Sequence, residues 1–274
     1  MDPARAGELE QLLRRHRITL QHRLGQNFLI NPALRDAIAD AAGATRGVDV
    51  LEVGAGVGTL TIALAARARR VVAVEFDRNL MPALQEVVAG CDNVEVVQAD
   101  ILRYETHTEI VAGNIPYNLT GALIPKLLDH PPRPRRLSFV VQKEVAERWT
   151  ATTMASLATI AVHVFAEPRL LMTVPAEAFF PSPRVDSALV VLEVRERPAV
   201  EVDDMRSFLR FVEAVFQFRR KQLGGTLARI AGTTGAEAAG RLAEIGIDPA
   251  RRPQTLKVSD WEAVYRAFIA RSGR

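Results

Sequence analysis

The stretch GNIPYN (113–118) places an amide, a rigid proline and an aromatic ring directly after the apolar run 110–112. Pro116 cannot donate a hydrogen bond to a sheet ladder, so a strand should end here. An amide and an aromatic side chain at the end of a strand are exposed and yet firmly held. Asn114 and Tyr117 together therefore suit the recognition of a flat ring that carries hydrogen-bonding groups.

A second chemical signal is the glycine-rich sequence EVGAGVG (52–58). Gly54, Gly56 and Gly58 let the backbone approach a ligand closely as it turns into a helix. A dinucleotide-binding turn would need another glycine at position 59, which is Thr59, so NAD is disfavoured. The pattern is better suited to a nucleoside ligand without a pyrophosphate, of which S-adenosylmethionine (SAM) is the common one.

Two acids end the next two apolar runs. Glu75 follows the first glycine by about twenty residues, where an acid can accept both ribose hydroxyls of an adenosine. Asp100 ends the run 93–100, where a carboxylate can accept from the adenine amino group. Ligands in parallel sheets bind at the carboxyl ends of the strands, so both acids and GNIPYN should face one site.

The flat ring can be a nucleobase whose exocyclic amine is methylated. Such an amine is a poor nucleophile, because its lone pair is delocalised into the ring. The Asn114 side-chain oxygen and the backbone carbonyl of Ile115 or Pro116 can accept its two N–H groups and free the lone pair for attack. Tyr117 can stack on the base, which is worth about 1–3 kcal/mol. Catalysis would then be mainly positioning, without a strong general base.

The elements that must position these residues alternate along the chain. Apolar runs predict six strands, at 48–54, 70–76, 93–100, 109–114, 136–142 and 188–194. Helical patterns separate most of them, as at 59–67 and 79–89, and an earlier helix should begin at Asn31-Pro32 and stop at Gly43. This order predicts an α/β domain with a mostly parallel sheet and helices on both faces.

After the last strand the pattern becomes purely helical. Helices are expected at 205–216, 236–245 and 259–270, with a basic segment between the first two. We therefore expect a catalytic domain over 1–196 and a small all-helical domain over 197–274.

Composition limits the possible classes of protein. The chain has 274 residues, a single cysteine and no apolar stretch long enough to span a membrane, and its start lacks an apolar signal-peptide core. The expected location is the cytoplasm, with neither a disulfide nor a metal site. The net charge of +3 is unevenly spread. Clusters suited to phosphate contact are Arg14, Arg15, Arg17 and Arg23; Arg133, Arg135 and Arg136; Arg219, Arg220 and Lys221; and Arg251 and Arg252.

Together these motifs resemble a known family. LGQNFL (24–29), EVGAGVG, VEFD (74–77), QAD (98–100), NIPYN, VQKEVAER (141–148), AFFPSPRVDS (178–187) and FRRKQL (218–223) are similar to the KsgA-type (RsmA) ribosomal RNA adenine N6,N6-dimethyltransferases. The resemblance implies a Rossmann-like SAM-dependent methyltransferase domain with a small helical domain. It also implies dimethylation of two adjacent adenosines in the 3′-terminal hairpin of small-subunit (16S) rRNA during ribosome biogenesis.

The resemblance also implies roles for individual residues. The SAM contacts are expected to be Gln26, Asn27, Leu29, Gly54, Gly56, Glu75, Asp100, Ile101 and Asn114. Asn114, Pro116, Tyr117 and Phe180 are expected to hold the target base, with Phe179 as an alternative to Phe180. Arg219, Arg220 and Lys221 in FRRK should contact rRNA. The protein is expected to be a monomer that releases S-adenosylhomocysteine and acts on immature small subunits.

The chain departs from the family pattern at two places. The tail of NIPYN reads Leu119-Thr120-Gly121-Ala122 instead of the usual Ile-Ser-Thr-Pro, and the segment 149–160 is shorter than usual. The second difference bears on substrate access. Two alternatives stay open, namely an Erm-type large-subunit rRNA adenine methyltransferase and a non-catalytic rRNA-binding assembly factor. PSPRVDS and FRRKQL favour the KsgA type over the Erm type.

Overall fold

The computed structural model describes residues 1–21, 25–105, 107–128, 131–151 and 156–269. The chain forms two compact units, made of residues 1–147 with 167–194 and of residues 148–166 with 195–274. This differs in one respect from the division expected at residue 197. The segment 148–166 groups with the C-terminal helices instead of the first unit. Its helix α7 (Leu157–Phe165) is buried along nearly its whole length and contacts the helices α8 and α11 of the second unit, described below.

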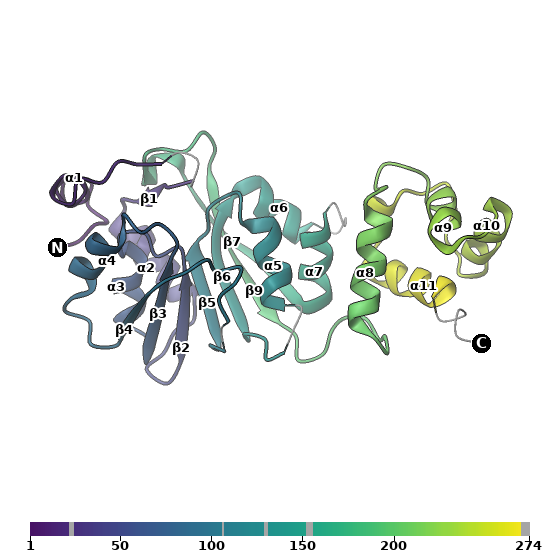
Figure 1. Cartoon of the computed structure of the whole chain (residues 1–274), viewed down its shortest axis with the longest axis horizontal. Coiled ribbons are helices and arrows are strands. Elements are labelled where there is room, and N and C mark those ends of the chain that lie inside the picture. Colours follow the sequence, from purple (N-terminus) through teal and green to yellow (C-terminus); the bar gives the residue numbers. More distant parts are fainter. Residues whose placement is uncertain (22–24, 106, 129–130, 152–155, 270–274) are drawn as a thin grey trace. The chain divides into compact units, whose positions relative to one another are not determined.

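A seven-stranded sheet in the order β4-β3-β2-β5-β6-β9-β7 forms the centre of the first unit (Figure 1). The pairs from β4 to β6 are parallel, and β9 runs antiparallel to β6. Six strands agree with the predicted runs to within about two residues at each end: β2 (Asp49–Val53), β3 (Arg70–Glu75), β4 (Val94–Gln98), β5 (Ile110–Asn114), β6 (Arg136–Gln142) and β9 (Ser187–Val194).

The seventh strand, β7 (Ala166–Val174), was not predicted. It lies at the edge of the sheet, and most of its side chains are at least partly exposed. An edge strand tolerates Pro168 and needs no regular apolar alternation, so its sequence gives little strand signal.

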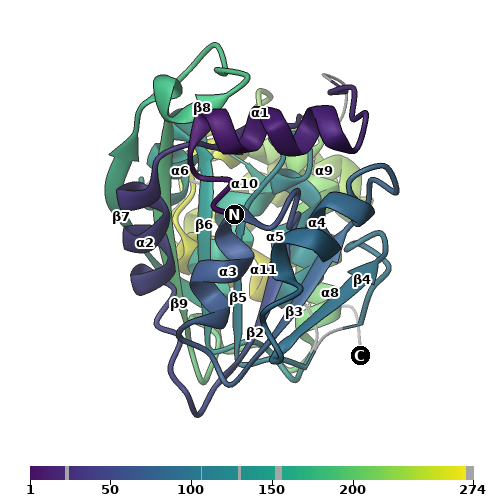
Figure 2. The ribbon, with the colours of Figure 1, turned by 90° about the vertical axis from the view of Figure 1, so that its left-hand side faces the viewer.

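Helices cover both faces of the sheet. Figure 2 looks onto α2 (Pro32–Ala41), α3 (Thr59–Ala65) and α4 (Met81–Val88), and α5 (Thr120–Leu128) lies on the opposite side. The helix α6 (Lys143–Thr150) follows β6 directly. At the start of α2, Asn31 accepts the Leu34 N–H at 3.0 Å, as its N-cap position predicted.

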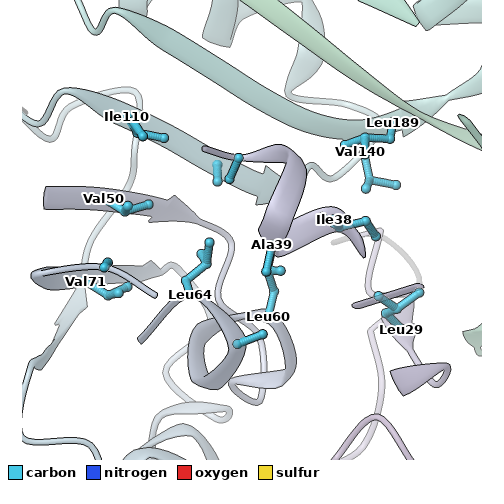
Figure 3. Close-up of a cluster of buried hydrophobic side chains, with 14 of the residues drawn as sticks. Leu29, Ile38, Ala39, Val50, Leu60, Leu64, Val71, Ile110, Val140 and Leu189 are labelled. Atoms are coloured by element: carbon cyan, nitrogen blue, oxygen red, sulfur yellow. The ribbon is translucent and has the colours of Figure 1, made fainter. Parts of the chain in front are cut away.

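The core under α2 and α3 is apolar and well packed (Figure 3). Val50, Val71 and Ile110 come from three adjacent strands and point to the same face. Leu60 and Leu64 of α3 pack onto them. This packing fixes the strand ends that carry the predicted site residues.

The N-terminal segment packs back onto this framework. The helix α1 (Ala6–Arg15) buries Leu9, Leu12 and Leu13. Beyond it, β1 (Phe28–Leu29) pairs antiparallel with β8 (Phe179–Phe180) in a separate two-stranded sheet.

The second unit is helical. Besides α7 it contains α8 (Met205–Phe216), α9 (Leu223–Ala231), α10 (Gly235–Glu244) and α11 (Val258–Phe268). Aromatic rings hold it together, with Phe208 edge-on to Tyr265 at 5.4 Å between ring centroids. The helix α9 was not predicted, because its sequence LGGTLARIA has two glycines in the first turn that lower helix propensity. Ala270, the predicted end of α11, lies outside the described residues.

Candidate active site

A cavity of about 260 Å³ lies in the first unit, at the carboxyl ends of strands β2 to β5. Its wall contains every residue predicted to contact the cofactor, namely Gln26, Asn27, Leu29, Gly54, Gly56, Glu75, Asp100, Ile101 and Asn114. Pro116 and Tyr117 also line it. The fold thus brings together residues from five separate stretches of the chain.

The turn after β2 depends on its glycines. Gly54, Gly56 and Gly58 have φ angles of +71°, +61° and +90°, a region that side chains rarely tolerate. Gly113 in β5 has a different constraint, because a Cβ there would lie 2.4 Å from the Val53 carbonyl oxygen. The glycine that begins GNIPYN therefore lets β5 pass close to the end of β2.

Glu75 braces this glycine turn from the end of β3. Its carboxylate accepts the Gly56 N–H at 2.8 Å and the Asp77 N–H at 2.7 Å. Burial raises the pKa of Glu75, and these backbone donors oppose that shift. The carboxylate is therefore fixed in orientation at the cavity wall.

Asp100 lies after β4 and is more accessible. Its side chain is 37% exposed and accepts the Leu102 N–H at 3.0 Å. The neighbouring Ile101 is buried in the same wall. Asp100 therefore retains capacity to accept a hydrogen bond from a ligand.

The segment before β1 closes one side of the cavity. Gln26 donates to the buried Asp77 at 2.7 Å and accepts the Gln21 N–H at 2.7 Å. The Asn114 Nδ2 donates to the Asn27 carbonyl at 2.8 Å. This bond orients the Asn114 amide, since its nitrogen faces the segment. Leu24, the first residue of LGQNFL, lies outside the described residues.

Tyr117 is held at its hydroxyl end. It shares a hydrogen bond of 3.0 Å with Ser187, which is fully buried at the start of β9. Burial raises the pKa of Tyr117, so the phenol remains neutral at pH 7. Its carbonyl accepts the Thr120 hydroxyl at 3.1 Å.

Phe180, which was predicted to hold the target base, is not among the residues that line this cavity. Phe179 lines the cavity, whereas Phe180 packs beside Leu9, Leu12 and Phe28 in the cluster around α1. Neighbouring side chains of a strand point in opposite directions. The alternative residue, Phe179, is therefore the one placed for contact with a ligand.

The basic clusters differ in their surroundings. Arg14, Arg15, Arg135, Arg136 and Arg251 form ion pairs with acids of their own unit. In contrast, no ion pair is found for the exposed Arg219, Arg220 and Lys221 within the described residues. Arg23 lies outside the described residues.

Sequence reasoning missed three side chains. Ser187 anchors Tyr117, and Asp77 anchors Gln26. Glu52 is buried in the cavity wall. All three lie in motifs quoted above, Glu52 in EVGAGVG, Asp77 in VEFD and Ser187 in AFFPSPRVDS, but no role was predicted for any of them.

The described residues hold neither a metal-binding cluster nor a membrane-spanning helix. They contain no group of three or more histidine, cysteine, aspartate and glutamate side chains suited to a metal ion. No helix among them is long and apolar enough to cross a membrane.

Comparisons with known proteins agree on one family. The family model for ribosomal RNA adenine dimethylase matches residues 17–268. The ribosomal RNA small subunit methyltransferase A of Pelotomaculum thermopropionicum is 39% identical over 288 residues, which cover 97% of each chain. The protein of the same name from Geobacillus thermodenitrificans is 36% identical over 285 residues, covering 98% of this chain and 97% of its own.

Solved structures support the fold. A dimethyladenosine transferase from Plasmodium falciparum matches with a TM-score of 0.74 and 24% identity, over 88% of this chain and 97% of its own. The 23S rRNA methyltransferase ErmE matches with a TM-score of 0.68 and 28% identity, over 88% of this chain and 99% of its own. The predicted Rossmann-like methyltransferase fold is therefore confirmed. Since the family model spans most of the chain, the protein belongs to the ribosomal RNA adenine dimethylase family of methyltransferases.

Proposed function

We propose that this protein transfers methyl groups from SAM to the N6 amines of two adjacent adenosines in the 3′-terminal hairpin of small-subunit (16S) rRNA. One observation carries the proposal. Asn114 shares a single cavity with Glu75 and Asp100, so an amine-holding group lies beside groups suited to an adenosine cofactor. We further propose that the protein acts as a cytoplasmic monomer on immature small subunits during ribosome biogenesis.

The residues of the cavity fit SAM. Each Glu75 oxygen accepts one backbone N–H, so each retains an acceptor position for a ribose hydroxyl. Asp100 would accept from the adenine amine. When bound, SAM supplies the electrophilic methyl group of its sulfonium and leaves as S-adenosylhomocysteine. The remaining contacts come from the glycine turn and from Gln26, Asn27, Leu29 and Ile101.

Asn114 would position the target amine. Its nitrogen is engaged by the Asn27 carbonyl, so its oxygen is available to accept an N–H of the base. The Pro116 carbonyl already accepts the Leu119 N–H at 2.9 Å, which favours the Ile115 carbonyl as the second acceptor. With both N–H groups held, the lone pair of the amine points out of the ring plane. The methylated amine is acidic and loses its proton without a strong general base.

Tyr117 and Phe179 would hold the faces of the base. The bond from Ser187 fixes the Tyr117 ring, and a pre-fixed ring loses less entropy when a base stacks on it. Phe179 belongs to the apolar core, which makes it a rigid partner. Arg219, Arg220 and Lys221 would neutralise rRNA phosphates.

Methylation assays on two RNA substrates test the proposal. The protein would be incubated with labelled SAM and either immature small subunits or large-subunit RNA, and the modified bases would be mapped. We expect two adjacent dimethylated adenosines near the 3′ end of small-subunit rRNA. Methylation of large-subunit RNA alone would instead identify the Erm-type activity, which the match to ErmE keeps as the second candidate. RNA binding without methylation of either substrate would indicate an assembly factor.

A further inference from the structure

A second depression in the first unit has no part in the proposed function. It is an open groove of about 580 Å³ between the end of β6, the start of α6 and the loop 181–186 before β9. Its volume falls within the range of small-ligand sites, about 300–1,000 Å³. The motifs VQKEVAER and PSPRVDS supply most of its walls. The groove and the cavity belong to the same compact unit.

The sheet register places this groove directly beside Tyr117. Val140 of β6, labelled in Figure 3, pairs with Asn114 and lines the cavity. Gln142 follows Val140 by two residues, so its side chain points to the same face of the sheet. There it pairs with Ser187 of β9, whose hydroxyl shares the 3.0 Å hydrogen bond with Tyr117. Since opposite Cβ atoms of an antiparallel pair are about 4.5–5.5 Å apart, Gln142 lies at the hydroxyl end of the Tyr117 ring.

Hydrogen bonds fix the loop wall of the groove. The Asp186 carbonyl accepts the Lys143 N–H at 3.0 Å, and the Asp186 Oδ1 accepts the Ala176 N–H at 3.0 Å. The same loop presents the exposed Arg184 and also Val185, which is 47% exposed. One wall of the groove therefore offers a guanidinium and an apolar side chain on a backbone that is already held in place.

The charged side chains of the groove do not favour an anion. The lining contains two cations, Lys143 and Arg184, and three acids, Glu144, Glu147 and Asp186. A phosphate would meet a net negative charge there, whereas the phosphate contacts of nucleic-acid-binding proteins depend on an excess of cations. A neutral, flat group with hydrogen-bonding atoms avoids this repulsion. Arginine guanidinium planes stack on unpaired bases, so such a group can also use Arg184.

Gln142 supplies the hydrogen-bonding atoms. Its side chain is partly buried and makes no hydrogen bond with the residues that the structure describes. A glutamine amide pairs with adenine through two bonds, because it accepts from the N6 amine and donates to N7. Guanine presents acceptors at both positions, O6 and N7, and leaves the amide oxygen without a donor. The groove therefore has the chemistry to distinguish adenine from guanine.

We propose that this groove binds the adenosine adjacent to the one that is being methylated, with Gln142 as the residue that determines specificity for it. The inference rests on the proposed function, because it takes two adjacent adenosines as the substrate. When the target base leaves its stack to enter the cavity, its neighbour loses a stacking partner. The groove receives that neighbour at the hydroxyl end of Tyr117, where Gln142 contacts N6 and N7 and Arg184 covers one face of the base.

Substituted substrates test this assignment. Immature small subunits that carry guanosine in place of either adenosine leave one adenosine to be methylated. Single-turnover rates with enzyme far below saturation, mapped at that base, report kcat/KM. For at least one of the two substitutions, the wild type should methylate the remaining adenosine about 5- to 150-fold more slowly than in the unsubstituted subunit, the range expected for one lost bidentate contact.

Gln142→Ala should lose this discrimination. It should methylate unsubstituted and substituted subunits at one rate, close to that of the wild type on the substituted subunit. Because Gln142 makes no hydrogen bond with the described residues, the variant should unfold at the wild-type temperature. Gln85→Ala is the matched control, since Gln85 is exposed on α4 and lines neither the cavity nor the groove. It should keep the wild-type rates and their ratio.

Two results would overturn the inference and leave the proposed function standing. One is a wild type that methylates the remaining adenosine at the same rate in all subunits. The other is a Gln142→Ala variant that keeps the wild-type ratio; if Lys143→Ala and Arg184→Ala then lower the salt dependence of RNA binding, the groove contacts the RNA backbone instead. A wild type that methylates no adenosine of unsubstituted small subunits would refute both the inference and the proposed function.

Discussion

Replacing Asn114 by alanine should slow methyl transfer by about 100-fold or more while RNA binding persists. The variant loses the amide oxygen that would hold the target amine. Deleting one pre-organised polar group of an active site typically costs about 2.7–4 kcal/mol, or about 100- to 1,000-fold in rate. The variant also loses the 2.8 Å bond to the Asn27 carbonyl. That loss of about 0.5–1.5 kcal/mol loosens the segment that carries Gln26 and Asn27, so it should weaken SAM binding by at most about 13-fold without affecting the chemical step.

Single-turnover methylation separates these two effects. With saturating SAM and small subunits, only the chemical step limits the rate. Asn93→Ala is a matched control, because Asn93 donates to the Ala65 and Ala68 carbonyls at 2.9 and 3.2 Å, away from the cavity. It should lower thermal stability and keep the parent rate. If Asn114→Ala also methylates at the parent rate, Asn114 does not position the amine, and the mechanism proposed here is wrong.

Three further variants test other parts of the site. Glu75→Ala should weaken SAM binding by about 10- to 150-fold in isothermal titration, since a charge-assisted hydrogen bond is worth about 1.5–3 kcal/mol; unchanged affinity in the folded variant would make Glu75 a purely structural brace. Tyr117→Phe and Ser187→Ala should each reduce the single-turnover rate only a few-fold, and no further when combined, because they break one bond. Tyr117→Ala should lower the single-turnover rate severely, because stacking on the base needs the ring; only a small decrease in the rate would argue against stacking. The exposed cations Arg219, Arg220 and Lys221 lie in the second unit. Changing all three to alanine should reduce the slope of log K for rRNA binding against log salt concentration by about 2–3 in magnitude and leave SAM affinity unchanged. If the variant keeps the slope of the parent protein, these side chains do not contact RNA.

The sequence by itself determined the framework of the site. Apolar runs predict six strands. The residue at the end of each strand can also be predicted, because a strand end depends on the local sequence. Parallel strands align their carboxyl ends at one edge of a sheet, so the order of residues along the chain suffices to assign Glu75, Asp100 and Asn114 to one site. The glycine turn could be predicted as well, because its positive φ angles depend on the local chain alone.

Contacts between distant segments were decided only by the tertiary structure. Phe179 and Phe180 are chemically identical neighbours, and the pairing of β8 with β1 sets which of them faces the cavity. The helix α7 groups with the C-terminal helices although it precedes the predicted domain boundary at residue 197. This grouping depends on contacts between distant segments, which a boundary read along the sequence does not reveal. The bond from Asn114 to the Asn27 carbonyl involves a backbone group, which carries no sequence signal. Burial raises the pKa of Glu52, and this burial exists only once the sheet has assembled.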